Sequence, residues 1–146
     1  MINKKTFFLL AAFCVSLGLK AQYANIDSAT AAKTLTQLSL LSKGSEFSTA
    51  AQFIAYRGPD LSRAWKETAD YSKPAENILV DAICQKINNT INQDPGQSIV
   101  GFRKESDEDN TWYILKLKYK KDGDEKTADF TFVKINGRFA LGNINE

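Results

Sequence analysis

The chain has 146 residues, of which 43% are hydrophobic, 25% charged and 11% aromatic, and this length argues for one domain. A formal net charge of +2 excludes a polybasic protein that binds nucleic acid through its phosphates. The sequence has no histidine, so the commonest general base and the commonest metal ligand are both missing.

Residues 1–21 have the three parts of a secretory signal peptide. Lys4 and Lys5 give a positive start, residues 7–19 form an apolar core, and Ala21 is a small residue suited to the position before a cleavage site. The apolar core is too short to cross a bilayer as a helix. We therefore expect cleavage near Ala21 and a periplasmic or secreted protein without a membrane span.

Cleavage would leave residues 22–146, which we expect to form a single domain. Three of the 19 basic residues and none of the 17 acidic ones lie in the signal, so the remaining chain has a net charge of −1. Cys84 is then the one remaining cysteine, and no intramolecular disulfide can form. It lies on the apolar stripe of a predicted helix, so we expect a buried and inert thiol.

Apolar periodicity predicts helices in the first part of this domain. Residues spaced by three and four predict a helix over 27–43, and a short second helix follows over 48–55. The strongest helical stripe begins at Pro74, a residue suited to the first position of a helix, and ends at 92–96. The segment 56–73 has no clean period and is predicted to be a loop.

After Gly96 the apolar period changes from helical to alternating, which indicates strands. The four predicted strands cover residues 97–105, 111–121, 125–135 and 138–144. Asp122-Gly123 and Asn136-Gly137 predict two-residue hairpin turns, because both central residues of a type I′ turn need a positive φ.

These turns predict the register of the hairpins. Leu115 then faces Phe130 on an apolar inner face, and Lys116 faces Asp129 on a charged outer face. One end of the outer face is apolar instead. It gathers Trp112, Ile114, Val133, Ile135, Ala140 and Ile144, with Arg138 beside them. Such a patch commonly marks a contact site, and a homodimer through it would need only one self-complementary surface.

Helices followed by an antiparallel meander predict an α+β fold, with the helices on one face of a curved sheet. Over nearly all of residues 22–146 this order resembles the nuclear-transport-factor-2-like group of the cystatin-like superfamily. The closing run TADFTFVKINGRFALGNI looks like the last two strands of small exported bacterial members, and AAQFIAYRGPDLSRAWKETADY is similar to a stretch in that subgroup. The resemblance implies a cone in which a bent four-stranded sheet wraps a long helix.

The superfamily contains isomerases, dehydratases, polyketide cyclases and catalytically silent binding domains, so the resemblance implies no single activity. Its enzymes place Asp, His or Tyr inside the cone. Here Asp129 falls on the outer face, where it cannot reach a substrate in the interior. Tyr113 and Tyr119 are the polar groups of the inner face, and we expect both to be core residues.

An isomerase or lyase would therefore take its catalytic groups from residues 56–71, with Asp60 or Asp70 as the base and Tyr56 or Tyr71 as the donor. The same segment mixes charges with large aromatic side chains and suits ligand binding as well. The ligand-binding residues expected on this basis are Tyr56, Arg57, Arg63, Trp65 and Tyr113. We favour the interpretation of this segment as a covering loop, in which Trp65 packs on the core and Arg63 pairs with Glu67.

Metal and cofactor sites find no support in the sequence. Asp107, Glu108 and Asp109 form an acidic cluster, but it lacks the spacing of a calcium loop. We expect an exported, non-enzymatic binding module for a small apolar ligand, a peptide or a protein partner, with the cavity isomerase or lyase as the alternative.

Overall fold

The computed structural model describes residues 26–146, so the predicted signal peptide lies outside the described residues. The helical elements are α2 (Ile26–Lys43), α3 (Phe47–Ala50), the 3-10 turn η1 (Ala51–Phe53), α4 (Pro74–Asn89) and the 3-10 turn η2 (Ile91–Gln93). The strands are β1 (Ser98–Ser106), β2 (Thr111–Lys121), β3 (Asp124–Ile135) and β4 (Arg138–Asn145). Within residues 26–146, no helix has both the length and the apolar character needed to cross a membrane.

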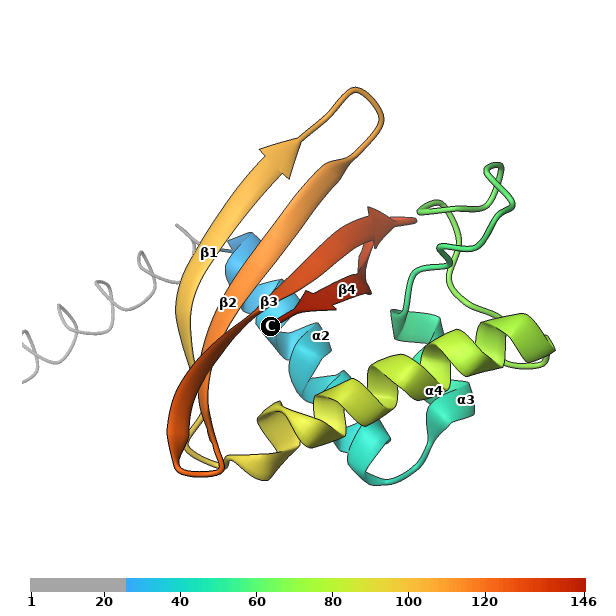
Figure 1. Cartoon of the computed structure of the whole chain (residues 1–146). Coiled ribbons are helices and arrows are strands. Elements are labelled where there is room, and N and C mark those ends of the chain that lie inside the picture. The colour runs from blue at the N-terminus through green and yellow to red at the C-terminus, as the bar shows by residue number, and fades with distance from the viewer. Residues whose placement is uncertain (1–25) are drawn as a thin grey trace, which may run out of the picture.

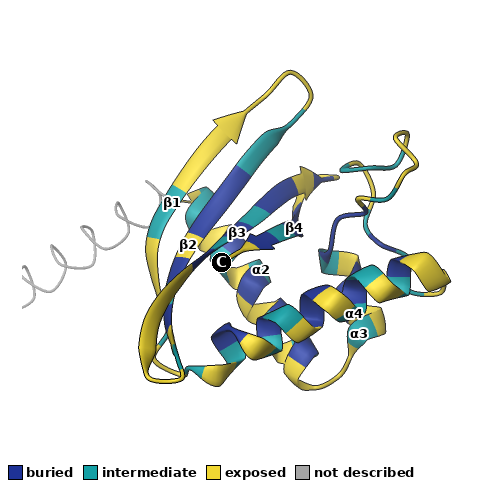
Figure 2. Cartoon of the chain, viewed as in Figure 1, coloured by how far each residue is buried: buried dark blue, intermediate teal, exposed yellow. Residues whose placement is uncertain are grey.

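The strands form one antiparallel sheet in the order β1-β2-β3-β4, and the helices pack against one of its faces (Figure 1). The α+β class and the helix-plus-meander order are therefore as predicted. Buried residues recur along α2 and α4 on the sides turned toward the sheet, and exposed residues occupy the opposite sides (Figure 2). This one-sided apolar pattern is what anchors both helices to the sheet.

The two long helices begin and end near the predicted residues. Ala31, Leu35 and Leu38 supply the buried stripe of α2, and Pro74 opens α4. The predicted helix over 48–55 is right only as far as residue 53. Ala55 is extended instead, because its N–H donates to the carbonyl of Leu141 in β4 at 2.9 Å.

The register of β2 against β3 is confirmed. Leu115 lies opposite Phe130, and Lys116 lies opposite Asp129 on the outer face. Both hairpin turns have positive φ at their two central residues, as type I′ turns require: Asp122, Gly123, Asn136 and Gly137. Phe130 is fully buried in one cluster with side chains of α2 and α4, so side chains fill the centre of the space between helices and sheet. A hollow of about 330 Å³ lies between α2 and the β1–β2 side of the sheet.

A β-bulge in β4 places Ile144 on the inner face of the sheet, not on the predicted outer face. The register follows the prediction from the turn to the pair Phe132–Leu141 and then shifts, so that Ile144 lies opposite Phe130. One extra residue reverses which side chains face inward. Ile144 therefore belongs to the main core, and its placement in the outer patch is wrong.

The rest of the predicted outer patch is covered by the chain itself. Val133, Ile135 and Ala140 form a second buried cluster, onto which Trp65 and Trp112 pack. Ile114 is buried as well. The patch is therefore not exposed as predicted, because Trp65 covers it. Trp65 belongs to the long segment between η1 and α4, residues 56–73, which we call the long loop.

Candidate functional site

The segment between η1 and α4 extends the sheet beyond β4. Residues 54–56 lie beside β4, and residues 67–69 lie beside them through two backbone hydrogen bonds. The N–H of Tyr56 donates to the carbonyl of Glu67 at 2.9 Å, and the N–H of Ala69 donates to the carbonyl of Ile54 at 2.8 Å. The loop predicted over 56–73 is therefore interrupted by this extended pairing, and the intervening residues 57–66 are its irregular part.

A buried carboxylate in the first turn of α4 holds this loop in place. The Arg63 guanidinium donates to both carboxylate oxygens of Glu76, at 2.8 and 3.2 Å. The backbone N–H of Asp70 donates to Glu76 Oε2 at 2.7 Å. Arg63 is the main cause of the lowered pKa of Glu76, which keeps this buried carboxylate charged.

Arg63 has two further partners. Its Nε donates to Glu67 at 2.6 Å, so the ion pair expected from the i, i+4 spacing is confirmed. Its guanidinium also lies over the Tyr56 ring, 4.2 Å from the ring centroid. The three contacts make Arg63 a structural centre of the loop.

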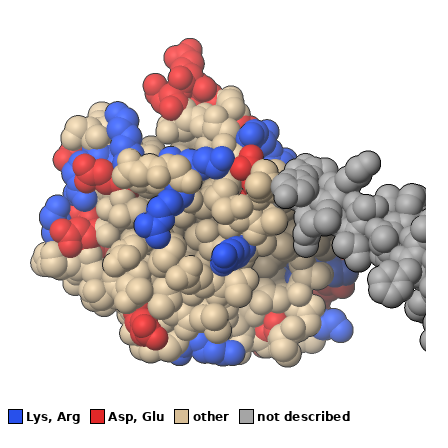
Figure 3. Space-filling model, turned by 180° about the vertical axis from the view of Figure 1, so that it is seen from behind, with Lys and Arg blue, Asp and Glu red and all other residues tan. Residues whose placement is uncertain are grey.

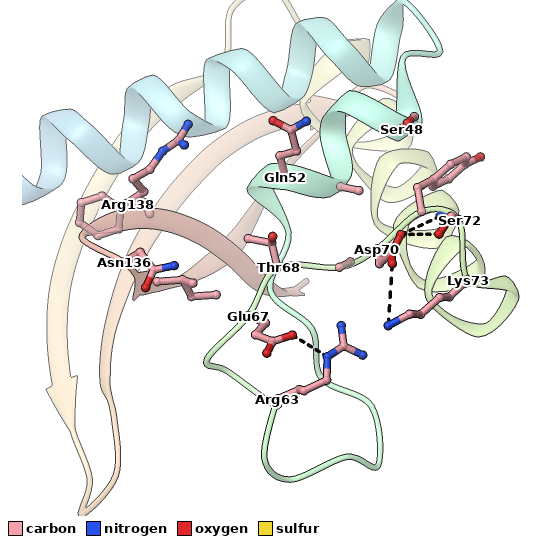
Figure 4. A pocket seen from close by; sticks show the side chains of 15 residues that line it. Ser48, Gln52, Arg63, Glu67, Thr68, Asp70, Ser72, Lys73, Asn136 and Arg138 are labelled. Carbon is pink, nitrogen blue, oxygen red and sulfur yellow. Dashed lines mark hydrogen bonds and ion pairs between the residues drawn. The ribbon is translucent and has the colours of Figure 1, made fainter.

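An open groove of about 710 Å³ lies where three parts of the chain meet: α3 with η1, residues 67–73, and the β3–β4 turn (Figure 4). Its size is that of ligand-binding pockets, which span roughly 300–1,000 Å³. The polar and charged side chains that line it are Ser48, Gln52, Arg63, Glu67, Thr68, Asp70, Ser72, Lys73, Asn136 and Arg138. A polar ligand would find donors and acceptors on every side.

The charges in the groove are unevenly compensated. Lys73 lies within 4 Å of both Asp70 and Glu76, and Arg63 is paired as described above. Arg138 has no acidic partner among the described residues, and its guanidinium lies 5.9 Å from the centroid of the Phe53 ring. The groove therefore has an uncompensated positive charge at its β3–β4 end.

The charged surface elsewhere is mixed in sign. In Figure 3 basic and acidic side chains are interspersed over the visible face, and acidic side chains gather at the top, where the β1–β2 hairpin ends. That tip contains Asp107, Glu108 and Asp109, all of them exposed. In residues 26–146 no group of three or more acidic or cysteine side chains is placed to hold a metal ion.

The predicted ligand-binding residues do not share one site. Arg63 lines the groove, whereas Tyr56 and Arg57 line a separate, more apolar cavity of about 430 Å³ beside the start of α4. Trp65 packs edge-on against Trp112 over the outer sheet face, at 5.0 Å between ring centroids. Tyr113 is buried in the core, as is the other inner-face tyrosine.

Three groove residues are absent from the candidate site residues predicted from the sequence: Gln52, Thr68 and Arg138. Gln52 has a signal in the sequence, because it follows Ser48 at i, i+4 on the polar side of a short helix. No sequence signal marks Thr68, because its one-residue bridge to Ala55 is too short to produce the alternating apolar pattern of a strand. The position of Arg138 directly after the Asn-Gly turn predicts its exposure but not its partners.

The predicted catalytic pairs are not assembled for acid–base chemistry. Each aspartate accepts hydrogen bonds from the side chain and the backbone N–H of the serine two residues on: Asp60 from Ser62 and Asp70 from Ser72. The serine hydroxyl is the leading cause of a lowered pKa in both, which weakens them as bases.

The tyrosine hydroxyls of these pairs have other hydrogen-bond partners. The Tyr71 hydroxyl donates to Asp81 at 2.9 Å, while the Tyr56 hydroxyl accepts from the backbone N–H of Asp60 at 3.2 Å. Asp60 is exposed, and Asp70 lines the groove. Tyr71 lines the groove as well, so Asp70 and Tyr71 share this space, but the carboxylate is held by Ser72 and the hydroxyl by Asp81.

Cys84 is fully buried, as predicted, and burial is the main cause of its raised pKa. A raised pKa keeps the thiol protonated and unreactive at neutral pH. No family model, curated protein or solved structure matches this chain.

Proposed function

We propose that this chain is an exported, non-enzymatic binding module whose ligand site is the groove between α3, residues 67–73 and the β3–β4 turn. The ligand is a polar peptide segment of a protein partner. A signal-like segment at residues 1–21 supports export to the periplasm or the exterior.

One observation carries this proposal: the space around Phe130 and Phe132 is packed, whereas the groove of about 710 Å³ lies outside it and has a polar lining. Phe130 and Phe132 are fully buried between the sheet and the helices. A cavity enzyme of the cystatin-like type needs a hollow interior, and a small apolar ligand needs apolar walls. The groove has neither property, whereas its mixed charges and amide and hydroxyl groups match those of a peptide.

The assignment to the nuclear-transport-factor-2-like group belongs to the same proposal. The helices on one face of a four-stranded meander support it. Within that group the chain would be one of the catalytically silent binding domains.

Selection of random heptapeptides displayed on phage tests the proposal. Gln52 is exposed in η1 and lines the groove, so Gln52→Trp should fill the groove and abolish binding of the enriched peptides. Gln37→Trp, at an exposed position of α2, is the matched control and should bind them as the unmodified protein does. Failure to enrich peptides, or equal binding by both variants, would contradict the proposal.

A further inference from the structure

We infer that the groove binds its peptide by strand addition: an extended segment pairs with the free backbone groups of Thr68 and places a carboxylate on Arg138. This inference rests on the proposed function and adds to it the conformation and the charge of the ligand. Peptides commonly bind in this way to exposed sheet edges.

The free edge follows from the hydrogen bonds of its neighbours. The carbonyl of Glu67 and the N–H of Ala69 are both directed at residues 54–56. Along an extended segment, alternate residues direct their backbone groups to opposite sides. The N–H and carbonyl of Thr68 therefore point away from the sheet, and no described residue forms a hydrogen bond with either.

This edge lies in the groove. Residues 67–70 are consecutive lining residues, as a strand along the wall of a groove would be. Figure 4 places Thr68 near the middle, with Gln52 on one side and the Arg63–Glu67 pair on the other. A peptide paired with Thr68 would thus lie between side chains able to contact both of its faces.

The opposite edge of the sheet is less suited to strand addition. β1 has a register irregularity between Ile99 and Gly101, followed by the charged residues Arg103, Lys104 and Glu105. Bulges and edge charges are the features by which sheet edges resist pairing with other chains. The Thr68 edge lies between the side chains of the groove, so it favours a single strand.

Charge complementarity determines the preferred peptide. Arg138 is the lining cation without an acidic partner among the described residues, whereas Glu67 and Asp70 would repel an acid near the middle of the groove. A peptide carboxylate is therefore expected at the β3–β4 end, where it forms a charge-assisted hydrogen bond with the guanidinium.

Four synthetic peptides test both parts of this inference. The parent is Ac-TVTVTVD-amide, and a second peptide has Lys in place of Asp. The third and fourth are N-methylated at one or the other set of alternate residues. An added strand uses the N–H groups of one set only, so one N-methylated peptide should bind as the parent does and the other about tenfold more weakly.

Binding is measured by titration of the ¹⁵N-labelled protein, together with hydrogen exchange of the Thr68 amide. The parent should slow that exchange and bind about tenfold more tightly than the Lys peptide. Arg138→Gln should remove this difference, whereas Lys126→Gln, at an exposed position of β3, should leave it unchanged.

Equal binding by the two N-methylated peptides, an unprotected Thr68 amide or no binding of the parent would overturn strand addition. An acid preference that survives in Arg138→Gln would overturn the role of Arg138. The groove as a peptide site would fail separately, if the phage-selected peptides bound without dependence on Gln52.

Discussion

Glu76 is the residue on which the position of the long loop depends. It contributes one carboxylate to three groups: the Arg63 guanidinium, the Asp70 N–H and, at 3.6 Å, the Lys73 ammonium. Because the side chain is almost wholly buried, its contacts with Arg63 and with the Asp70 N–H are largely shielded from water, whereas Lys73 is half-exposed. Loss of the carboxylate would leave Arg63 and the Asp70 N–H short of a partner, and both belong to groove residues.

Glu76→Gln should lower the free energy of unfolding by about 2 kcal/mol, because a buried charge-assisted network loses its charge. Urea unfolding followed by tryptophan fluorescence measures this change. Glu67→Gln is the control, since its side chain is 55% exposed and an exposed pair contributes less than about 1 kcal/mol. Equal losses in the two variants would contradict the role given to Glu76.

The contribution of Glu76 to stability should also depend on pH. The pKa of Glu76 lies below its ordinary value of 4.5 in the folded protein, so the unfolded chain binds the proton more readily. The ionised Glu76 side chain therefore contributes its full share of stability at a pH above that ordinary value, and this contribution is lost as the pH falls through the pKa of the folded state. The difference in stability between the unmodified protein and Glu76→Gln should therefore shrink on acidification below about pH 4.5. A constant or growing difference would contradict this assignment.

Gly142 is the residue that lets Trp65 lie on the sheet. A Cβ atom at this position would lie 2.6 Å from Cζ3 of Trp65, so Gly142→Ala should displace the indole and cost about 1–3 kcal/mol of stability. Gly101→Ala in β1 is the control, because its Cβ would meet its nearest atom at 3.5 Å. Urea unfolding and the tryptophan emission maximum check both variants. If Gly142→Ala changed neither the free energy of unfolding nor the emission maximum, Trp65 would not pack against Gly142 as described.

Among the elements, the strands differ in how far they are protected. β2 and β3 are paired on both sides and carry most of the inner face, whereas β1 is an edge strand whose residues are mostly exposed. Amide hydrogen exchange should therefore be slowest for Leu115 and Phe130 and faster along β1. Exchange of β1 as slow as that of β2 would indicate that another chain covers this edge.

The elements also mark how far the sequence predicts the fold. The Asn-Gly and Asp-Gly turns specify their hairpin registers, and so the inward set of β2 and β3 follows from sequence alone. The bulge in β4 does not, because Gly142 permits an extra residue without requiring one. Its consequence is the reversed orientation of Ile144.

The candidate site was less predictable than the fold. The groove is formed by three segments that are distant in sequence and meet because residues 54–56 pair with β4. Pairings of one residue leave no periodic pattern, so neither the Thr68 edge nor the covering of the outer patch by Trp65 follows from sequence. Arg63 is predicted from the sequence as a ligand-binding residue because its charge lies in a loop between regular elements, and the structure places it in the lining of the groove.

At the scale of the whole molecule, a packed α+β core supports a site built at its edge. The core holds the sheet and helices in place, and the long loop, held by Glu76, forms a wall of the groove. This arrangement separates stability from binding: substitutions at Gln52 or Arg138 should change ligand affinity without changing the core. Because different residues would serve stability and binding, substitutions on the surface of the groove can test ligand binding while the fold stays intact.

The most direct measurement is chemical-shift mapping of the ¹⁵N-labelled protein with a phage-selected heptapeptide. The largest shifts are predicted for residues 48–52, 67–73 and 136–139, which surround the groove. If the largest shifts lay along β1, or around Trp112 on the outer face, the groove would not be the binding site.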